Sequence, residues 1–332
     1  MNQSGPSPQH IMQLITGGWA AGILGAASTH AVFAHLEDGA HNGQLLAAKA
    51  SISLRGAQVL LDGVLALGLV ELSGGVYRNT AEAETFLIEG RPGYLGGFAK
   101  VMAGSLGEWT TMAEVARTGV PVKDDTTDVA DNPFWSELVP AIAPLSVPSA
   151  MAAAEVLGLA AAAELSILDV GGGSGIYSAI LLGLNRVARS TQLDWAPVNA
   201  IAQRIVASHG VGDRFSTIDG DFHTVDFGEH RYDVGIYSHI AHQESPAENI
   251  AIFTKFRHAI RPGGALVVND FVVEDDRSGP PFALLFASEM LLNNGHGSTW
   301  CRKDYKAWLT EAGFTQISFH PTAGPATLVI AR

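Results

Sequence analysis

A glycine-rich turn at residues 169–175, with the sequence DVGGGSG, is the clearest chemical signal in this chain. It follows an apolar run that predicts a buried strand, and it precedes a helical pattern at 176–184. Glycines in such a turn let a ligand approach the backbone, because no Cβ atom intervenes. Ile176 stands where the dinucleotide-binding fingerprint needs its last glycine, and the turn lacks the Gly-Lys-Ser/Thr ending of a phosphate-binding loop. The turn therefore predicts a nucleotide-like cofactor, and its Asp169 favours one that carries an ammonium group and hydroxyls.

Aspartates are expected at the ends of three successive strands. Asp169 lies at the end of the first, and Asp194 ends the second, at the spacing after Gly171 where an acidic side chain binds ribose hydroxyls. Asp221 follows the third strand and, with Phe222, could hold an adenine by a hydrogen bond and a ring contact. Each aspartate alone could be a helix cap, a solvent-exposed strand end or a turn residue. Together with the glycine turn, they indicate a cofactor site.

At these residues the chain resembles the class I S-adenosylmethionine-dependent methyltransferases, whose hallmark is an acidic residue followed by alternating glycines. The likeness continues at 232–237, similar to the fourth strand of that family, and at 261–270, similar to its next turn and fifth strand. The resemblance implies an α/β fold: a Rossmann-like, doubly wound, seven-stranded sheet whose last strand is antiparallel, with 314–320 and 327–332 as the final pair. It also implies S-adenosyl-L-methionine as the cofactor. The residues implied to bind it are Asp169, Gly171, Gly173, Gly175, Asp194, Asp221 and Phe222.

The elements before this domain predict a helical module that ends in a hairpin. Apolar residues recur at helical spacing in 9–36 and 54–67, and 70–78 alternates around Gly74-Gly75, which suit a tight turn. This outline is winged-helix-like, and a winged helix seen alone is most often a DNA reader. The helix at 54–67 offers only Arg55 to a phosphate backbone, so packing and dimerisation are favoured over DNA binding.

The N-terminal module narrows the resemblance to the dimeric small-molecule O-methyltransferases of the acetylserotonin and caffeic acid types. That family implies a homodimer formed through the N-terminal module, with linker helices that close over the acceptor pocket. We therefore expect a mainly helical, winged-helix-like dimerisation domain at 1–88 and a helical connector contributing to the acceptor pocket at 89–150. The S-adenosylmethionine-binding methyltransferase domain is expected at 151–332.

Composition restricts the partners of this 332-residue chain. Its net charge of −13 disfavours nucleic acid, because binding to nucleic acid depends on Lys and Arg neutralising phosphates. Its single cysteine, Cys301, cannot form an internal disulfide, which suits a reducing compartment. Residues 1–10 carry no secretory pattern, and glycines interrupt the apolar stretch at 11–36. The composition predicts a cytoplasmic protein with no nucleic-acid and no membrane partner.

A histidine is expected to act as the general base. Methyl transfer to a hydroxyl requires alignment of the acceptor and often removal of its proton. In the family this histidine follows the fourth strand, and here residues 238–244 read SHIAHQE. The register places His242 on the catalytic position, with His239 beside it. The prediction is O-methylation of a small aromatic or secondary-metabolite acceptor by His242, with no metal.

The residues expected to orient His242 depart from the family pattern. The family places an aspartate after the base and a later glutamate beside it, whereas this chain has Gln243 and, further on, the segment GSTWC at 297–301. Either Glu244 or Asp270 could supply the missing carboxylate, and the sequence leaves the choice open. Asp270 could equally contact the acceptor or cap its strand.

The acceptor pocket is expected to be lined by side chains from the connector, the strand ends and an apolar helix at 282–294. For each apolar residue, packing in the core is the alternative. The candidates are Trp109, Phe134, Trp135, His239, Asp270, Phe286, Met290 and Asn293.

Two other functions would use the same chain differently. Some relatives of this architecture methylate a carbon next to a 2-oxo acid with a bound metal, for which His242, Glu244 and His296 could be ligands. In the other function, the chain would be a winged-helix regulator whose methyltransferase-like domain only senses a ligand. The low positive charge of 54–67 disfavours the regulator. The sequence does not identify the acceptor.

Overall fold

The computed structural model describes residues 6–122 and 132–332 and divides into two compact units, Met1–Thr110 and Thr111–Arg332. The domain limits expected from the sequence, after residues 88 and 150, do not coincide with this division. Residue 150 lies inside α9 (Pro133–Leu157), whose Ala143, Ala150 and Ala153 enter the same apolar cluster as β3 (Ser166–Val170). The change of sequence pattern near residue 150 therefore marks the approach to the first strand and not the edge of a unit.

Among the described residues, α9 is also the only single helix that is long and apolar enough to cross a membrane, over Phe134–Leu157. Helices α1 (Gln9–Ile15) and α2 (Gly17–Thr29) meet the same test only as a pair bent by 49°. Core helices of soluble proteins also meet it. The buried alanines of α9 and the three prolines inside it fit a helix that packs on a sheet.

The N-terminal unit consists of short helices and a two-stranded hairpin. Its core gathers large apolar side chains such as Phe33, Leu46 and Leu61, which are almost fully buried. The predicted hairpin is present, and Gly74 and Gly75 take φ angles of 58° and 79° at its turn. The elements after α2 are α3 (Val32–Glu37), α4 (Gly43–Ala50), α5 (Leu54–Ala66), β1 (Val70–Ser73), β2 (Val76–Asn79), α6 (Ala81–Phe86), α7 (Gly96–Ser105) and η1 (Glu108–Thr111).

The C-terminal unit is built on a seven-stranded sheet with the order β5-β4-β3-β6-β7-β9-β8. The first five strands of this order pair in parallel, and β9 is antiparallel to both of its neighbours. This confirms the predicted doubly wound sheet with an antiparallel last strand. The strands after β3 are β4 (Arg189–Asp194), β5 (Phe215–Asp219), β6 (Tyr232–Ser238), β7 (Ile260–Asp270), β8 (Ile317–Pro321) and β9 (Thr327–Ala331).

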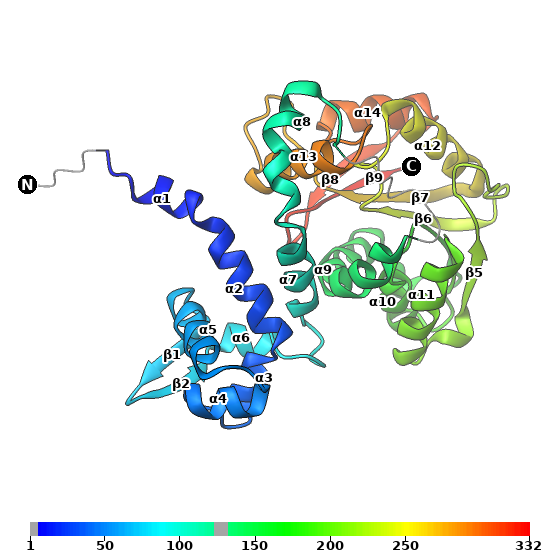
Figure 1. Cartoon of the computed structure of the whole chain (residues 1–332). Helices are drawn as coiled ribbons and strands as arrows, with labels where there is room; N and C mark the ends of the chain where they lie inside the picture. The colour runs from blue at the N-terminus through cyan, green and yellow to red at the C-terminus, as the bar shows by residue number, and fades with distance from the viewer. Residues whose placement is uncertain (1–5, 123–131) are drawn as a thin grey trace, which may run out of the picture. The chain divides into compact units, whose positions relative to one another are not determined.

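Helices cover both faces of this sheet (Figure 1). Successive strand residues point to opposite faces, so Leu168 of β3 belongs to the cluster packed under α12 and α14, and Ile167 to the cluster packed under α9 and α10. Because both faces are apolar, polar chemistry is confined to the ends of the strands. The helices besides α9 are α8 (Met112–Thr118), α10 (Ile176–Leu184), α11 (Ala196–Ser208), α12 (Pro246–Ala259), α13 (Pro281–Asn293) and α14 (Arg302–Glu311), with short η2 (Leu159–Ala161) and η3 (Gly212–Arg214).

One local expectation is wrong. Residues 261–264 were expected as a turn before the fifth strand, but they form the first part of β7. The pairing of β7 with β6 shifts its register between Tyr232 and Val234, and Gly263 takes a φ of 85° there. The bulge absorbs the glycines without ending the strand.

Candidate active site

The candidate site lies at the carboxyl ends of five adjacent parallel strands. In the order β5-β4-β3-β6-β7, these ends carry Asp221, Asp194, Asp169, His242 and Asp270. Parallel strands present all their carboxyl ends at one edge of a sheet, which is where open α/β sheets bind ligands. The strand order therefore sets the three predicted cofactor aspartates next to the predicted base and its neighbour.

The glycine turn is held in a shape that only glycine adopts without strain. Gly171, Gly173 and Gly175 have φ angles of 63°, 55° and 69°. A Cβ on Gly171 would lie 2.8 Å from the side chain of Ile240, and one on Gly175 would lie 2.8 Å from Val206. At the ends of the strands, the turn therefore exposes backbone atoms that no Cβ atom covers.

Two carboxylates are buried at this turn. Ser178 donates a hydrogen bond to Asp169 Oδ2 (3.2 Å), whereas Oδ1 has no partner among the described residues. Asp194 accepts bonds from the backbone N–H groups of Gly173 (2.9 Å) and Trp195 (2.7 Å). Burial, together with the nearby negative charge of Asp194, raises the pKa of Asp169 to about 7. Burial also raises the pKa of Asp194 to about 6, so a cationic ligand would relieve both groups.

The third aspartate lies on the loop after β5, together with its aromatic neighbour. Asp221 accepts hydrogen bonds from the backbone N–H and from Nδ1 of His223, at 2.8 and 2.7 Å. The Phe222 ring packs against the ring of His223 and against the edge of Tyr237, with centroid distances of 4.4 and 6.3 Å. The pair predicted to hold adenine is therefore in place beside the sheet, and His223 is a neighbour that the sequence reasoning missed.

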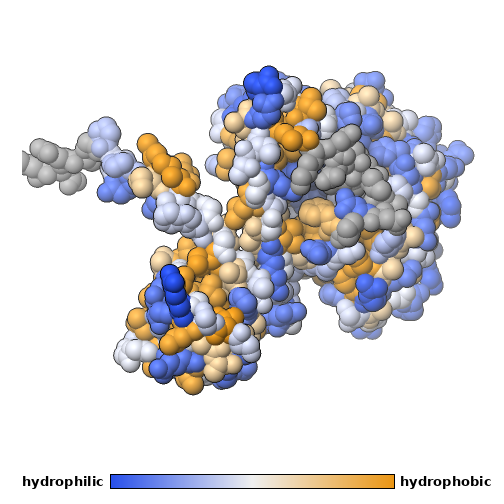
Figure 2. Space-filling model, viewed as in Figure 1, coloured by the Kyte–Doolittle hydropathy of each residue, from blue (hydrophilic) through white to orange (hydrophobic). Residues whose placement is uncertain are grey.

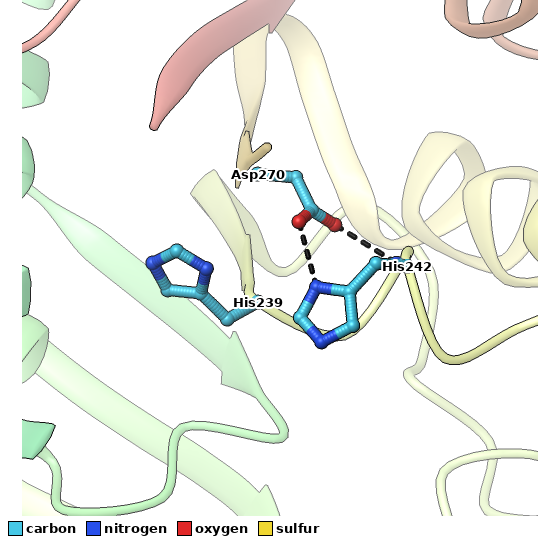
Figure 3. Close-up of side chains that lie close together, drawn as sticks. All are labelled: His239, His242 and Asp270. Atoms are coloured by element: carbon cyan, nitrogen blue, oxygen red, sulfur yellow. Dashed lines mark hydrogen bonds and ion pairs between the residues drawn. The ribbon is translucent and has the colours of Figure 1, made fainter. Parts of the chain in front are cut away.

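His242 and Asp270 form a hydrogen-bonded pair. Asp270 Oδ1 accepts a bond from His242 Nδ1 (2.7 Å), and Oδ2 accepts one from the backbone N–H of His242 (2.9 Å), as Figure 3 shows. The backbone N–H of Phe271 donates a third bond to Oδ1 (2.8 Å). Burial alone would raise the pKa of Asp270, but the imidazole of His242 holds it below its ordinary value. Of the two carboxylates that the sequence left open, the structure brings Asp270 to the ring.

His239 lies beside this pair in a strained conformation. Its φ is 59°, which side chains larger than glycine rarely adopt. Asn269 Nδ2 donates to His239 Nε2 (3.0 Å), so the proton of the neutral ring lies on Nδ1, which is buried without a partner among the described residues. Burial lowers the pKa of His239 to about 4, so this ring is uncharged at neutral pH and is a poor competitor for the role of base.

Phenylalanine rings cluster beside His242. The ring of Phe286 on α13 meets the His242 ring edge to face at 4.9 Å, and Phe271 stacks on it at 5.9 Å. Phe282 joins Phe271 at 4.9 Å. Phe286 was predicted to line the acceptor site, whereas Phe271 and Phe282 were missed. The position of Phe271 directly after a strand-end aspartate was the signal that could have found it.

The other acceptor candidates are placed differently. Met290 is buried in α13, and Asn293 donates hydrogen bonds to Glu289 of the same helix. Trp135 packs in a small apolar cluster with Trp195, the residue directly after Asp194. The ring centroids of Phe134 and Trp135 are 5.5 Å apart. Trp109 belongs to η1 in the N-terminal unit. Contact of these side chains with an acceptor stays a prediction.

The residues of the metal-dependent alternative do not form one cluster. Glu244 is hydrogen-bonded to His223 Nε2 (2.9 Å), whereas His242 is bonded to Asp270. Among the described residues, the groups with the spacing of metal ligands are His239 with His242 and Asp270, and His223 with Glu244 and Glu248. His296 belongs to neither group, so the geometry gives this alternative no support.

Known proteins are similar to this chain in sequence and in fold. A model of the O-methyltransferase domain matches residues 142–315. The chain is 30% identical to the 3-hydroxy-5-methyl-1-naphthoate 3-O-methyltransferase of Streptomyces sahachiroi, over 96% of this chain and 92% of that protein. It is 31% identical to the tetracenomycin polyketide synthesis 8-O-methyl transferase TcmO of Streptomyces glaucescens, over 86% of this chain and 85% of that protein. Human N-acetylserotonin methyltransferase in complex with SAM has the same fold, with a TM-score of 0.87 at 22% identity over 100% of this chain and 99% of that chain.

Replacing Asp270 tests how much the buried pair contributes to stability. Asp270→Asn retains one acceptor oxygen but turns an NH₂ group toward an N–H donor, so a buried donor loses its partner. We expect the free energy of unfolding to fall by about 1–3 kcal/mol, measured by urea denaturation. Asp213→Asn, at an exposed aspartate of η3, is the control and should leave the denaturation midpoint unchanged. Equal midpoints for both variants would contradict a stabilising role for Asp270.

Proposed function

The chain belongs to the O-methyltransferase family, and we propose that it methylates a hydroxyl of a small aromatic acceptor with His242 as the general base. It is an S-adenosylmethionine-dependent enzyme, and the human protein with the same fold was solved in complex with SAM. The observation that carries the proposed base is the 2.7 Å hydrogen bond from His242 to the buried Asp270, beside the row of cofactor aspartates. The ligand-sensing regulator and the metal-dependent C-methyltransferase receive no comparable support.

The residues at the glycine turn fit S-adenosylmethionine. The unpartnered oxygen of Asp169 and the raised pKa values of Asp169 and Asp194 call for a positively charged ligand with hydrogen-bond donors. Asp194 would hold the ribose hydroxyls, and Asp221 and Phe222 the adenine. When bound, this cofactor supplies an electrophilic methyl group.

The pair of His242 and Asp270 can move the proton of the acceptor. Because the Nδ1–H group donates a hydrogen bond to Asp270, the neutral ring carries its proton on Nδ1 and its lone pair on Nε2. Nε2 can then take the proton of the acceptor hydroxyl as that oxygen becomes nucleophilic. Asp270 fixes the orientation and the tautomer of the ring, a role that an aspartate has in a Ser-His-Asp triad.

The rings around His242 favour an aromatic acceptor. Phe271, Phe282 and Phe286 present apolar edges and faces next to the base, which suit stacking on a flat ring and exclude water. The Streptomyces sahachiroi relative is named for a hydroxynaphthoate, a substrate of this shape. A phenolic hydroxyl is also acidic enough for a histidine to deprotonate in the transition state.

We further propose that the enzyme is a homodimer formed through its N-terminal unit and works in the cytoplasm without nucleic acid. The apolar side chains of Ile11, Leu14, Ile15 and Trp19 are 60%, 67%, 70% and 75% exposed. Figure 2 shows apolar residues gathered on α1. An exposed apolar patch on a folded chain marks an interaction surface, and a second copy supplies the same surface.

Titration calorimetry tests the cofactor site. S-adenosylmethionine should bind the wild-type protein, and Asp194→Ala should weaken binding about 10- to 100-fold, because a hydrogen bond to a charged group is lost. Asp213→Ala is the matched control, and circular dichroism checks that each variant is folded. Unchanged affinity in folded Asp194→Ala would contradict the role of this carboxylate.

Replacement of the base tests the reaction. His242→Ala should lower kcat about 10²- to 10⁴-fold with little change in the affinity for S-adenosylmethionine, because the ring contacts the acceptor side. The assay follows S-adenosylhomocysteine formation with a panel of phenols. The control is His258→Ala, at an exposed histidine of α12. Full turnover in His242→Ala would remove the general base and leave the family assignment intact.

Analytical ultracentrifugation tests the dimer. The wild-type protein should sediment at twice the 34.9 kDa of one chain. The double variant Ile15→Asp, Trp19→Asp places charges in the apolar patch and should shift the equilibrium to the monomer. Val187→Asp, at an apolar residue of the C-terminal unit that is 57% exposed, should not. A dimer that persists in the double variant would place the interface elsewhere.

A further inference from the structure

His223 joins two loops through two carboxylates. Its Nδ1 is 2.7 Å from Asp221 Oδ1, and its Nε2 is 2.9 Å from Glu244 Oε2. The histidine and Asp221 side chains are each 33% exposed, whereas the Glu244 side chain is only 5% exposed. We call this arrangement the Asp221–His223–Glu244 bridge.

The bridge requires a protonated ring. A neutral imidazole carries one N–H, and two carboxylate acceptors need two, so both bonds exist only in the imidazolium form. Partial burial lowers the pKa of His223, but the bonds to Glu244 and Asp221 outweigh burial and raise it overall. Glu248 of α12 also faces the ring, and Lys255 of α12 donates a hydrogen bond to the carbonyl oxygen of His223 (3.1 Å).

The two loops that the bridge joins are not neighbours in the sheet. Asp221 follows β5 and Glu244 follows β6, and these strands are separated by β4 and β3. Glu244 comes two residues after His242. Asn249 Nδ2 donates to the carbonyl oxygens of Ala241 (2.9 Å) and Glu244 (3.3 Å), so the segment that carries the base is tied to Glu244. The bridge therefore connects the expected adenine loop directly to the loop of the base.

We propose that His223 is a positioning residue that couples occupancy of the cofactor site to the seating of His242, through its bonds to Asp221 and Glu244. This inference rests on the proposed cofactor site. A ligand held by Asp221 fixes that carboxylate, and the protonated ring transmits the constraint to Glu244 and the base loop. The coupling is reciprocal, so closing the base loop strengthens cofactor binding by the same factor.

The proposal has a defined pH dependence. The bridge is complete below the ordinary pKa of histidine and is lost as the pH rises through the raised pKa of His223. Above that pH one ring nitrogen has no proton to share, and it faces a carboxylate that it repels. The part of the cofactor affinity that depends on His223 should therefore be lost in a step as the pH rises. Ionisation of Asp169 and Asp194, whose pKa values are raised to about 7 and about 6, acts in the opposite direction but equally in a His223 variant.

Calorimetry with S-adenosylhomocysteine at several pH values from 6 to 9 measures this step. At low pH, His223→Gln should bind about 5-fold or more weakly than the wild type, and this difference should disappear in a step as the pH rises. Glu244→Gln keeps a hydrogen-bond acceptor but removes the negative charge that raises the pKa of His223, so the step should move to lower pH. His209→Gln, at an exposed histidine at the end of α11, is the matched control and should behave like the wild type.

Hydrogen exchange measured by mass spectrometry tests the coupling itself. At saturating S-adenosylhomocysteine, peptides that cover residues 239–245 should exchange more slowly in the wild type and should show no such slowing in His223→Gln. Equal protection and equal affinity in the two proteins would overturn the positioning role of His223. No binding to the folded wild-type protein at any pH would remove the cofactor site as well, so the two proposals fail distinguishably.

Discussion

The order of the parallel strands is the constraint on which the site depends. Both faces of the central strands are covered by apolar clusters, so polar groups can serve a ligand only at the strand ends. The strand order β5-β4-β3-β6-β7 places five such ends in one row, from Asp221 at one side to Asp270 at the other. The sheet itself therefore places the proposed cofactor residues next to the proposed base.

Burial of two carboxylates at the strand ends lowers the stability of the folded chain. Two aspartates are nearly fully buried at the glycine turn, and burial raises the pKa of both. Without a cation, ionisation of these carboxylates lowers the stability of the folded chain, and this loss develops as the pH rises from the ordinary carboxyl range through about 6 and about 7. A ligand that carries positive charge and hydroxyl donors offsets this loss. The buried aspartates proposed to bind the cofactor thus also lower the stability of the folded chain, and such a trade-off between stability and function is common in proteins.

The sequence predicted those parts of the site that depend on one strand and the turn after it. The glycine turn, Asp169, Asp194 and the Asp221-Phe222 pair are local patterns, and the structure places each at its strand end. His242 was predicted from its position in the segment that follows the fourth strand of the family pattern. The bonds of His242 to Asp270 and of His223 to Glu244 depend on which strands and loops become neighbours in space, which spacing along the chain does not encode. For the same reason, the connector aromatics Phe134 and Trp135 could be recognised as apolar, but their cluster with Trp195 could not be foreseen.

The segment 297–301, where the family pattern places a glutamate beside the base, packs against the backbone of His242 in this chain. It begins with Gly297, and a Cβ there would lie 2.4 Å from the carbonyl oxygen of His242. The next residue, Ser298, donates its backbone N–H to that same oxygen (2.8 Å). This segment therefore supports the backbone of the base and leaves no room for a side chain at its first position. The ring takes its orienting partner from the neighbouring strand β7, where Asp270 is fully buried and already fixed by the N–H of Phe271. A carboxylate on a sheet strand is held more rigidly than one on a loop, so the relocation favours a fixed orientation of His242.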